Sequence, residues 1–269
     1  HSRRCDLRDS LDGNEVLMTA LVECKDLVVG YEGKPLLQGI DLVIEPGEIL
    51  ALLGSSGSGK STLMRTMIGL LPPLSGEVLL FGESLYDLPL DERHRLLRRT
   101  GTAFQMDALF GSMTVGENVA LPLRELTNLP MPIVREMVKN RLGLVGLGGK
   151  ESRDPTSLSG GERKRAALAR ASILDPEVLF ADEPSAGLDP IIAASIDETL
   201  LQFRKALDLT IVIVTHELES IRAIVDRAVM FSRGKIAAVG PISELEKSHD
   251  DEVYNFFHRV PERVAAEAR

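Results

Sequence analysis

Residues Gly54-Ser-Ser-Gly-Ser-Gly-Lys-Ser-Thr62 carry the strongest structural signal in this chain. They follow the apolar run Ile49-Leu-Ala-Leu-Leu53, which is typical of a buried parallel strand, and they precede a segment, 63–70, with the apolar spacing of a helix. A strand, a glycine-rich loop and a helix in this order are the context in which the pattern G-x-x-x-x-G-K-S/T binds phosphate. We therefore predict a phosphate-binding loop between a strand and a helix.

The residue types in this loop suit a nucleotide. Glycine allows backbone φ angles above zero, which turn successive N–H groups toward one anion, and the following helix adds its positive N-terminal end. Lys60 can then reach the β- and γ-phosphates, and the Ser61 hydroxyl can bind Mg²⁺. The alternative, a glycine-rich turn with an accidental lysine, would arise in roughly one chain in a hundred of this length. The residues expected to contact the nucleotide are Gly54, Ser55, Ser56, Gly57, Ser58, Gly59, Lys60, Ser61 and Thr62.

Length, charge and cysteine content narrow the class of protein. The chain has 269 residues, enough for one large domain or two small ones. Its net charge of −9 argues against nucleic acid as the main partner, because nucleic-acid-binding surfaces are basic. No apolar run reaches the length of a membrane span. Cys5 and Cys24 are too few for a disulfide framework, which with a nucleotide motif favours a reducing cytosol, and Cys24 is expected to be a small core residue.

The N-terminal segment has a different composition from the rest. Residues 1–17 are polar and charged, and they lack the apolar middle of a signal peptide. The chain begins with His1, and Met18 stands just ahead of the first strand-like segment. We interpret residues 1–20 as a leader or as an extension foreign to the natural protein, with a genuine N-terminal extension as the alternative.

Strand and helix patterns alternate along the rest of the chain, which predicts an α/β fold with a largely parallel sheet covered by helices on both faces. From Gln105 to about Ser159 the strand patterns vanish, and this part is predicted to be a helical insertion. Predicted strands span 21–31, 41–44, 49–53, 77–81, 178–181, 210–214, 227–232 and 236–239, with a short one ending at Phe104. Predicted helices span 63–70, 91–99, 134–142, 162–174 and 191–207.

Two adjacent carboxylates, Asp182 and Glu183, end the apolar strand pattern that begins at Val178. In a protein with a phosphate-binding loop, the first acid belongs near Mg²⁺. The second acid, Glu183, is placed to polarise an attacking water as a general base. The alternative is a strand that merely ends in an acidic turn.

A second glycine-bearing turn, Leu158-Ser-Gly-Gly-Glu162, stands at the start of a predicted helix. Ser159, Gly160 and Gly161 offer hydrogen-bond donors to an anion there. One phosphate does not need two such loops from one molecule, so we predict that this loop serves the nucleotide held by a second copy of the chain. An ordinary capping box between Ser159 and Glu162 can exist at the same time.

Together these motifs resemble those of the ATP-binding cassette ATPases, and the similarity covers essentially all of residues 21–245. The resemblance implies a P-loop (RecA-like) core with a mostly parallel sheet, an antiparallel β subdomain and an inserted helical subdomain. The core would comprise 21–104 and 163–245, and a C-terminal tail would comprise 246–269. The inserted helical subdomain would span 105–162 and end with the family's signature loop, Leu158–Glu162. ATP and Mg²⁺ are the implied ligands, bound at the interface of a homodimer.

The resemblance also implies roles for individual residues. Tyr31 resembles the aromatic residue that stacks on adenine, and Gln105 the glutamine that links Mg²⁺ to the membrane partner. Asp189, in Ser185-Ala-Gly-Leu-Asp189, falls in the loop that crosses the dimer interface, and His216 resembles the histidine that contacts the γ-phosphate and holds the general base. Gln105 and His216 follow predicted strands, whose carboxyl ends are where α/β folds bind ligands. The alternatives are that Tyr31 caps a strand and that the other two are ordinary polar residues at strand ends.

Segment 107–125 is similar to the region after the glutamine in ATPases of the bacterial Mce-associated lipid transporters. Segments 180–190 and 254–257 fit the same group, although amino-acid importers share parts of these motifs. The expected function is ATP hydrolysis by a homodimer docked on integral membrane permease subunits at the cytoplasmic face of the inner membrane. This hydrolysis would drive transport of phospholipid or other lipid across the bacterial cell envelope. An Mce-type lipid-binding protein is a further candidate partner.

Three other functions remain open at this point. The same ATPase could move polar solutes such as amino acids. A soluble cassette acting on ribosomes or DNA would require two fused cassettes, a coiled coil or a basic surface, and the sequence carries none of these. A non-catalytic nucleotide-binding regulator is disfavoured by the presence of both Glu183 and His216.

The tail places four large apolar residues within five positions: Val253, Tyr254, Phe256 and Phe257. Soluble monomers rarely leave such a patch exposed to water. These side chains are therefore expected either to fold back on their own chain or to bind the other subunit of the dimer.

Overall fold

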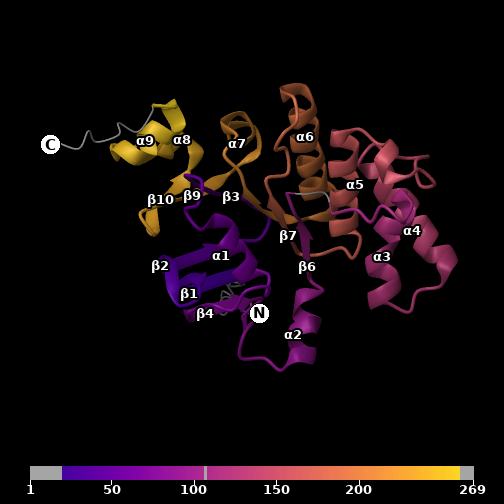
Figure 1. The fold of residues 1–269 in the computed structure, drawn as a ribbon, viewed down its shortest axis with the longest axis horizontal. Coiled ribbons are helices and arrows are strands. Elements are labelled where there is room, and N and C mark those ends of the chain that lie inside the picture. Colours follow the sequence, from indigo (N-terminus) through magenta and orange to yellow (C-terminus); the bar gives the residue numbers. More distant parts are fainter. Residues whose placement is uncertain (1–19, 106–107, 261–269) are drawn as a thin grey trace, which may run out of the picture.

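The structure, a computed structural model, describes residues 20–105 and 108–260. This part of the chain contains two sheets flanked by helices (Figure 1). The smaller sheet is antiparallel, with strand order β2-β1-β4-β5, and comprises β1 (Val22–Tyr31), β2 (Lys34–Ile44), β4 (Ser75–Leu80) and β5 (Glu83–Ser84). The larger sheet has strand order β10-β9-β3-β8-β7-β6 and comprises β3 (Ile49–Gly54), β6 (Thr100–Ala103), β7 (Val178–Asp182), β8 (Thr210–Val214), β9 (Arg227–Ser232) and β10 (Lys235–Pro241).

The larger sheet is parallel from β9 to β6, and β10 joins β9 as an antiparallel hairpin. Every residue of β3, β7 and β8 is buried, which explains why these strands read as continuous apolar runs. The predicted α/β fold with a largely parallel sheet and an antiparallel β part is therefore confirmed. Residues 1–19, which make up nearly all of the proposed leader and include Cys5, lie outside the described residues.

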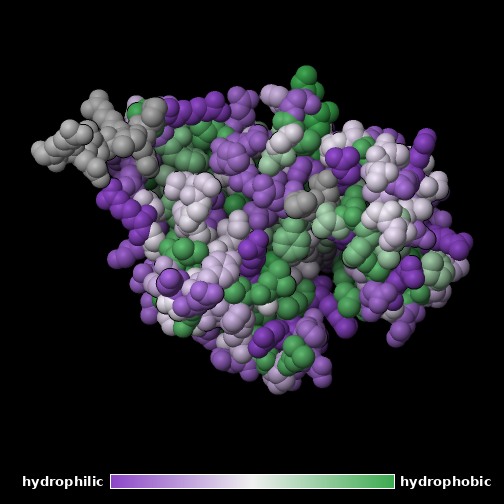
Figure 2. All heavy atoms as spheres, viewed as in Figure 1, coloured by the Kyte–Doolittle hydropathy of each residue, from purple (hydrophilic) through white to green (hydrophobic). Residues whose placement is uncertain are grey.

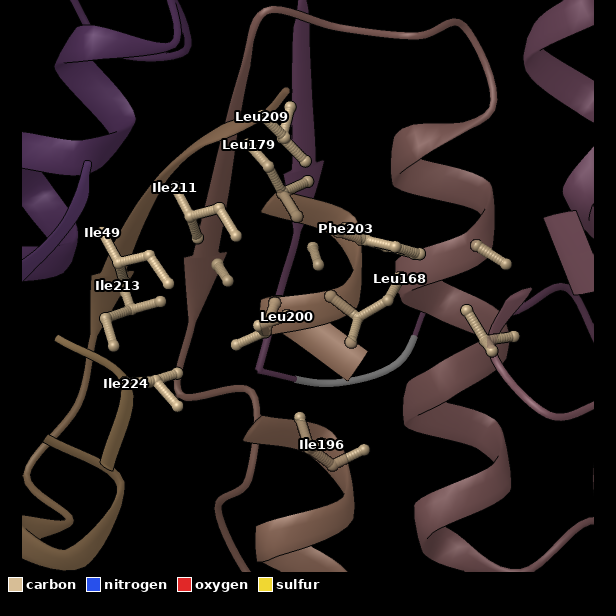
Figure 3. Packing of buried hydrophobic residues seen from close by; sticks show 14 of the residues in the cluster. Ile49, Leu168, Leu179, Ile196, Leu200, Phe203, Leu209, Ile211, Ile213 and Ile224 are labelled. Carbon is tan, nitrogen blue, oxygen red and sulfur yellow. The ribbon is translucent and has the colours of Figure 1, made fainter. Parts of the chain in front are cut away.

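Alternate residues of the larger sheet belong to two separate hydrophobic cores. Ile49, Ala51 and Leu53 of β3 join the core under α5 and α6, whereas Leu50 and Leu52 join the core under α1 and the antiparallel sheet. Figure 3 shows the first core, in which Leu168, Leu200 and Phe203 of the helices meet the side chains of the strands. This alternation follows from the two-residue period of a strand and gives the sheet a helical layer on each face.

Helices cover these cores and extend the molecule at both ends. The described part contains α1 (Lys60–Met67), α2 (Leu90–Leu97), α3 (Val115–Leu126), α4 (Met131–Leu144), the 3-10 turn η1 (Pro155–Ser157), α5 (Gly160–Ser172), α6 (Pro190–Leu207), α7 (Leu218–Ile224), α8 (Ile242–Leu245) and α9 (Asp251–His258). In Figure 1, α3 and α4 lie beyond α5 at one end, and α8 and α9 lie beside β9 and β10 at the other. Within these described residues, every helix is too short or too polar to span a membrane.

Strand β2 and helix α3 are among the elements that differ from the sequence prediction. Strand β2 begins at Lys34 rather than at Asp41, because shifts in its register with β1 and the positive φ of Gly39 (59°) interrupt the regular alternation of buried residues. Helix α3 was not predicted, because Gly116 and Pro122 within it are poor helix formers.

Buried polar contacts stabilise α3 despite these residues. Its first turn has a capping box between Thr114 and Glu117. The fully buried side chain of Asn118 donates to the carbonyls of Phe110, Met113 and Thr114 and accepts from the Phe110 N–H, which anchors the helix to the preceding loop.

The tail folds back on its own chain through α9. Val253 and Phe257 are 0% and 1% exposed and belong to the core under α5 and α6, so the fold-back alternative is confirmed for these two residues. Phe256 packs partly against the same core, whereas Tyr254 remains 44% exposed. Cys24 is buried as expected, and desolvation raises the pKa of its thiol to about 12.

The face shown in Figure 2 is mostly hydrophilic at its rim, and hydrophobic residues gather toward its centre. The central region is hollowed between the part that contains β1, β2 and α1 and the part that contains α3 and α4. The glycine-rich loop connects β3 to α1, so it begins at the carboxyl end of β3.

Candidate functional site

The glycine-rich loop leaves β3 at Gly54 and enters α1 at Lys60. The predicted positive φ angles are found at Gly54 (143°), Gly57 (79°) and Gly59 (98°). Gly54 also lies so close to β9 that an added Cβ would be 2.5 Å from the carbonyl oxygen of Phe231. The loop therefore requires glycine both for its backbone conformation and for its packing.

Lys60 occupies the centre of this loop. Its Nζ donates to the carbonyl oxygens of Gly54 (2.9 Å) and Ser55 (2.8 Å), and it lies 3.3 Å from Oγ of Ser58. The residue is only 8% exposed, and this burial lowers its pKa, against the opposing influence of the nearby carboxylates of Glu183 and Asp182. A buried cation held by weak carbonyl partners is well suited to bind a phosphate oxygen instead.

A hydroxyl and a carboxylate meet beside the lysine. Ser61 Oγ donates to Oδ1 of Asp182 at 3.1 Å, and Asp182 is 6% exposed at the end of β7. Burial raises the pKa of Asp182, while the hydrogen bond from Ser61 lowers it. Oxygen ligands of this kind, one hydroxyl and one carboxylate, are what Mg²⁺ uses when phosphates and water complete its coordination. These residues therefore fit the predicted metal.

Glu183 and His216 come together because their strands are neighbours in register. Asp182 pairs with Val214 across β7 and β8, so the residues that follow each strand emerge side by side. The Glu183 N–H donates to the Val214 carbonyl at 2.8 Å, and Oε1 of Glu183 lies 2.8 Å from Nδ1 of His216.

The other carboxylate oxygen of Glu183 has no such partner. Oε2 is buried and makes no hydrogen bond within the described part of the chain. Glu183 also has a φ of 50°, a left-handed conformation that costs about 1–3 kcal/mol for a residue with a side chain. An unpaired buried acceptor costs about 1–3 kcal/mol more, and such groups occur where a substrate or water supplies the missing donor. Glu183 thus has the environment of a general base.

Tyr31 lies next to the phosphate-binding loop. It ends β1, its side chain is close to the first turn of α1, and its hydroxyl accepts a hydrogen bond from Arg65 at 3.3 Å. Hydrogen bonds lower the pKa of its hydroxyl, the one with Thr62 more than the one with Arg65. The residue is 43% exposed, which leaves its ring accessible to an adenine, and stacking on adenine stays a prediction.

Gln105 is not bonded to the other metal-site residues. It is exposed just beyond β6, and its backbone carbonyl accepts from Lys164 Nζ at 3.0 Å. No hydrogen bond among the described residues joins it to Ser61 or Asp182. Its predicted contact with Mg²⁺ and with a membrane partner therefore stays a prediction.

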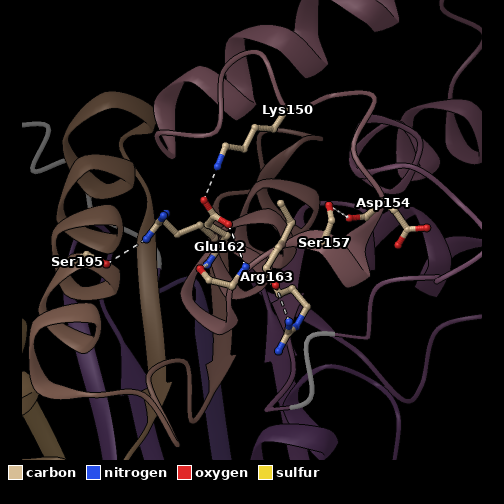
Figure 4. Close-up of polar contacts among 9 residues, drawn as sticks. Lys150, Asp154, Ser157, Glu162, Arg163 and Ser195 are labelled. Carbon is tan, nitrogen blue, oxygen red and sulfur yellow. Dashed lines mark hydrogen bonds and ion pairs between the residues drawn. The ribbon is translucent and has the colours of Figure 1, made fainter.

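The signature loop is a helix cap in this chain. Ser159 is the N-cap of α5, where its Oγ accepts from the N–H of Glu162 and its own N–H donates to that carboxylate at 2.9 Å, so the predicted capping box is confirmed. Lys150 pairs with the same carboxylate, and Arg163 donates to the Leu158 carbonyl (Figure 4). These contacts are local, and within the described part of the chain no hydrogen bond of Ser159 reaches the phosphate-binding loop.

Asp189 has a similar capping role at the start of α6. Its Oδ1 accepts from the N–H groups of Ile191 and Ile192, each at 3.1 Å. Gly160 of the signature loop and Gly187 of the loop before Asp189 line one open groove of about 670 Å³, which Gln105 also borders. One chain thus brings together Lys60, Ser61, Asp182, Glu183 and His216, and none of these five residues lines the groove that Gly160 and Gly187 border.

Arg65 is a site residue that the sequence analysis missed. It lies on α1, donates to Tyr31 and lowers the pKa of Asp182 through its charge. Its position one turn after Ser61 could have revealed it, because residues four apart share a face of a helix.

Comparison with known proteins identifies the family of this chain. The sequence profile of the family described as "ABC transporter" matches residues 37–186, more than half of the chain. The chain belongs to the ABC transporter family. The matched region includes the phosphate-binding loop, the signature loop and the acidic pair, so within this family the chain is the ATP-hydrolysing cassette.

Two curated relatives illustrate where the cassette falls in the family. It is 38% identical to the "probable ribonucleotide transport ATP-binding protein mkl" of Mycobacterium leprae, over 90% of this chain and 70% of that protein. It is 37% identical to the "intermembrane phospholipid transport system ATP-binding protein MlaF" of Haemophilus influenzae, over 88% of this chain and 89% of that protein.

Solved structures of similar cassettes share the fold. The cassette superposes on cbiO1 from Clostridium perfringens, part of the ABC transporter complex cbiONQ, with a TM-score of 0.79 at 30% identity over 86% of this chain and 92% of that one. It superposes on the dimeric ATP-binding cassette MJ0796, bound to ADP and Pi in a post-hydrolysis state, with a TM-score of 0.75 at 29% identity over 82% of this chain and 98% of that one.

Gly161 is predicted to be essential for packing α5 against α6. An added Cβ would lie 2.3 Å from Cγ2 of Ile192, so Gly161→Ala is expected to destabilise the protein by about 1–3 kcal/mol in urea unfolding. In the Ile192→Ala background the clash is absent, so adding Gly161→Ala there should lower the free energy of unfolding by much less than it does in the wild-type protein. Gly143→Ala, on α4 with no atom within 4 Å of the added Cβ, is the control and should stabilise by about 0.5–1 kcal/mol. A Gly161→Ala protein as stable as the Gly143→Ala protein would contradict the packing role.

Proposed function

We propose that this cassette is the ATP-hydrolysing subunit of a transporter that moves phospholipid across the bacterial cell envelope. The observation that carries hydrolysis is the buried, unpaired Oε2 of Glu183, whose other oxygen is held by His216. The cargo is inferred from the relatives named MlaF, which match nearly the whole of this chain, and from the similarity of segment 107–125 to lipid-transport ATPases. The site of action would be the cytoplasmic face of the inner membrane.

Residues of one chain would bind the phosphates of ATP and accept the proton of the attacking water. The N–H groups of the loop from Gly54 to Thr62, the N-terminal end of α1 and Lys60 would bind the phosphates of ATP and balance their charge. Glu183 Oε2 would accept a proton from a water molecule as the water oxygen bonds to the γ-phosphorus and the bond to the ADP oxygen breaks. His216, through Nδ1, holds Glu183 in place for this transfer. The products are ADP and phosphate.

The metal site is proposed from the donors that surround Lys60. Ser61 Oγ and Asp182 would hold Mg²⁺, with Gln105 as a further ligand. The ion would neutralise charge on the transferring phosphoryl group. Tyr31 would stack on the adenine beside this centre, with its hydroxyl already fixed by Arg65.

A homodimer would complete each site. Ser159 and Asp189 are exposed, Gly160 lines the open groove, and Gly161 is buried behind them against α6. We infer that they face the nucleotide held by a second copy, so that two ATP molecules are enclosed between two chains. The dimeric form of the MJ0796 cassette supports this arrangement.

The permease subunits would dock on the predicted helical subdomain, 105–162. A groove of about 640 Å³ runs between α3 and α4. Its lining combines apolar residues such as Ala120 and Val134 with three acidic residues (Glu117, Glu136, Glu151) and three basic ones (Arg124, Arg135, Lys139). Opening of the dimer after hydrolysis would move this groove and so the permease. An Mce-type lipid-binding protein would belong to the same complex.

A polar cargo is the second candidate. The mycobacterial relative is named for ribonucleotide transport, which favours a phosphate-bearing polar solute over an amino acid. Neither of the two curated relatives described above is named for amino-acid transport. The acidic net charge of −9 continues to disfavour a cassette that acts on nucleic acid.

Glu183→Gln is expected to lower ATP turnover by about 100-fold or more, because the amide cannot accept the proton. Nucleotide affinity should stay within a few-fold, since the phosphate-binding loop is unchanged, and an ATP-bound dimer should accumulate in size-exclusion chromatography. Steady-state hydrolysis and nucleotide binding measure the two effects separately. Lys60→Ala is the contrasting variant and should weaken binding itself. Turnover near the wild-type rate in Glu183→Gln would show that another group is the base.

Complementation tests whether the signature loop acts on the partner's nucleotide. A heterodimer of a Lys60→Ala chain and a Ser159→Arg chain has one site with both lesions and one with neither. Mixing the two inactive proteins should therefore restore part of the ATPase activity. If heterodimers form, as shown by two affinity tags, and no activity returns, the two-loop arrangement is wrong.

The cargo is tested on the assembled transporter. The cassette should copurify with integral membrane subunits encoded beside it, and mass spectrometry of the complex in detergent should find bound phospholipid. ATP should then drive phospholipid movement between labelled vesicles, and the Glu183→Gln complex should not. Movement of nucleotides without lipid would favour the polar cargo.

A further inference from the structure

Helix α9 faces the start of the phosphate-binding loop. A small cavity of about 180 Å³ separates them, and its walls come from three parts of the chain. Ser55 belongs to the loop, Phe231 and Ser232 to the end of β9, and Glu252 and Asn255 to α9. The tail thus reaches the nucleotide site of its own chain.

Helix α9 is a folded part of the cassette rather than a loose extension. Its buried residues Val253 and Phe257 anchor it in the core, and the Phe257 carbonyl accepts from Arg222 at 3.3 Å. Asp250 caps its first turn by accepting from two N–H groups. These residues hold the helix in place, but none of them lines the cavity beside the phosphate-binding loop.

Glu252 is the polar residue through which α9 holds the end of β9. Its carboxylate accepts from the Ser232 hydroxyl, and it pairs with Arg233 at 2.5 Å. Arg233 is largely exposed, so this ion pair contributes little, and the hydrogen bond to Ser232 carries most of the contact.

The end of β9 in turn contacts the start of the phosphate-binding loop. Phe231 pairs with Gly54 across β9 and β3, and its carbonyl leaves no room for a Cβ at Gly54. The next carbonyl, that of Ser55, accepts from Lys60 at 2.8 Å. A continuous set of contacts therefore runs from Glu252 through Ser232 and the β9 strand to the lysine of the loop.

We propose that Glu252 is a positioning residue for the nucleotide, and that docking of α9 on β9 sets the affinity of the phosphate-binding loop for nucleotide. Loss of the Glu252 contact would loosen the end of β9 at Ser232 and Phe231. Because Phe231 pairs with Gly54, the Gly54 and Ser55 carbonyls that accept from Lys60 would then be held less firmly. This inference rests on the proposed nucleotide site. The competing explanations are that Glu252 only stabilises the fold, or that the tail acts by binding the second subunit.

The test compares nucleotide affinity, turnover and stability in variants of the full chain. Glu252→Ala is expected to raise the Kd for ADP and the KM for ATP by about 3- to 10-fold while kcat stays within about twofold, because one hydrogen bond to a charged group is lost outside the reacting atoms. Ser232→Ala removes the same bond from the other side and should give the same shift. Glu252→Gln keeps an oxygen that can accept from Ser232 and should restore most of the affinity.

Asp251→Asn is the matched control, since it removes a neighbouring charge on the exposed side of α9 and should leave Kd unchanged. Lys60→Ala tests the site itself. If Lys60→Ala weakens ADP binding and Glu252→Ala lowers only the melting temperature, the positioning role is overturned and the nucleotide site stands. If neither variant weakens binding, the proposed site fails and this inference with it. An unchanged Kd with a weaker dimer would overturn it in favour of binding to the second subunit.

Discussion

The parallel pairing of β3, β8 and β7 is the constraint on which the site depends. Every residue of these strands is buried, so each apolar side chain contributes about 1.5–3 kcal/mol and the strands cannot shift without losing several such contributions together. Their register places Leu52 beside Val214 and Val214 beside Asp182. The loops that leave these three strands therefore begin at one edge of the sheet. Chemistry that requires a lysine, a carboxylate and a histidine is assembled there from distant parts of the sequence.

Sequence alone predicted the elements whose signal is local. The strands β3, β7 and β8 are unbroken apolar runs, and the loop at Gly54 has a pattern with a physical explanation at each position. Helix α3 could not be predicted, because it forms through Asn118 and its contacts with residues before the helix in spite of Pro122. The full length of β2 was hidden by irregular register with its neighbour.

The candidate site likewise has features that the sequence predicts and features that depend on packing between distant segments. Lys60, Ser61, Asp182, Glu183 and His216 were all expected from motifs and from the family resemblance, and the structure brings them together. The unpaired Oε2 of Glu183 and the approach of Gly161 to Ile192 were not predictable, because each depends on how segments distant in sequence pack. The signature loop caps α5 through Ser159 and Glu162, while Gly160 of the same loop lines an open groove.

The two hydrophobic cores on opposite faces of the larger sheet have a consequence for how the protein tolerates change. Leu50 and Ala51 are adjacent in sequence but belong to different cores, whereas Ala51 and Ile213 share one although they are far apart in the chain. Energetic effects of substitutions are additive for residues without shared contacts and couple for residues that pack together. Each core can therefore accumulate compensating substitutions on its own, so odd and even positions of β3 are expected to drift independently during evolution.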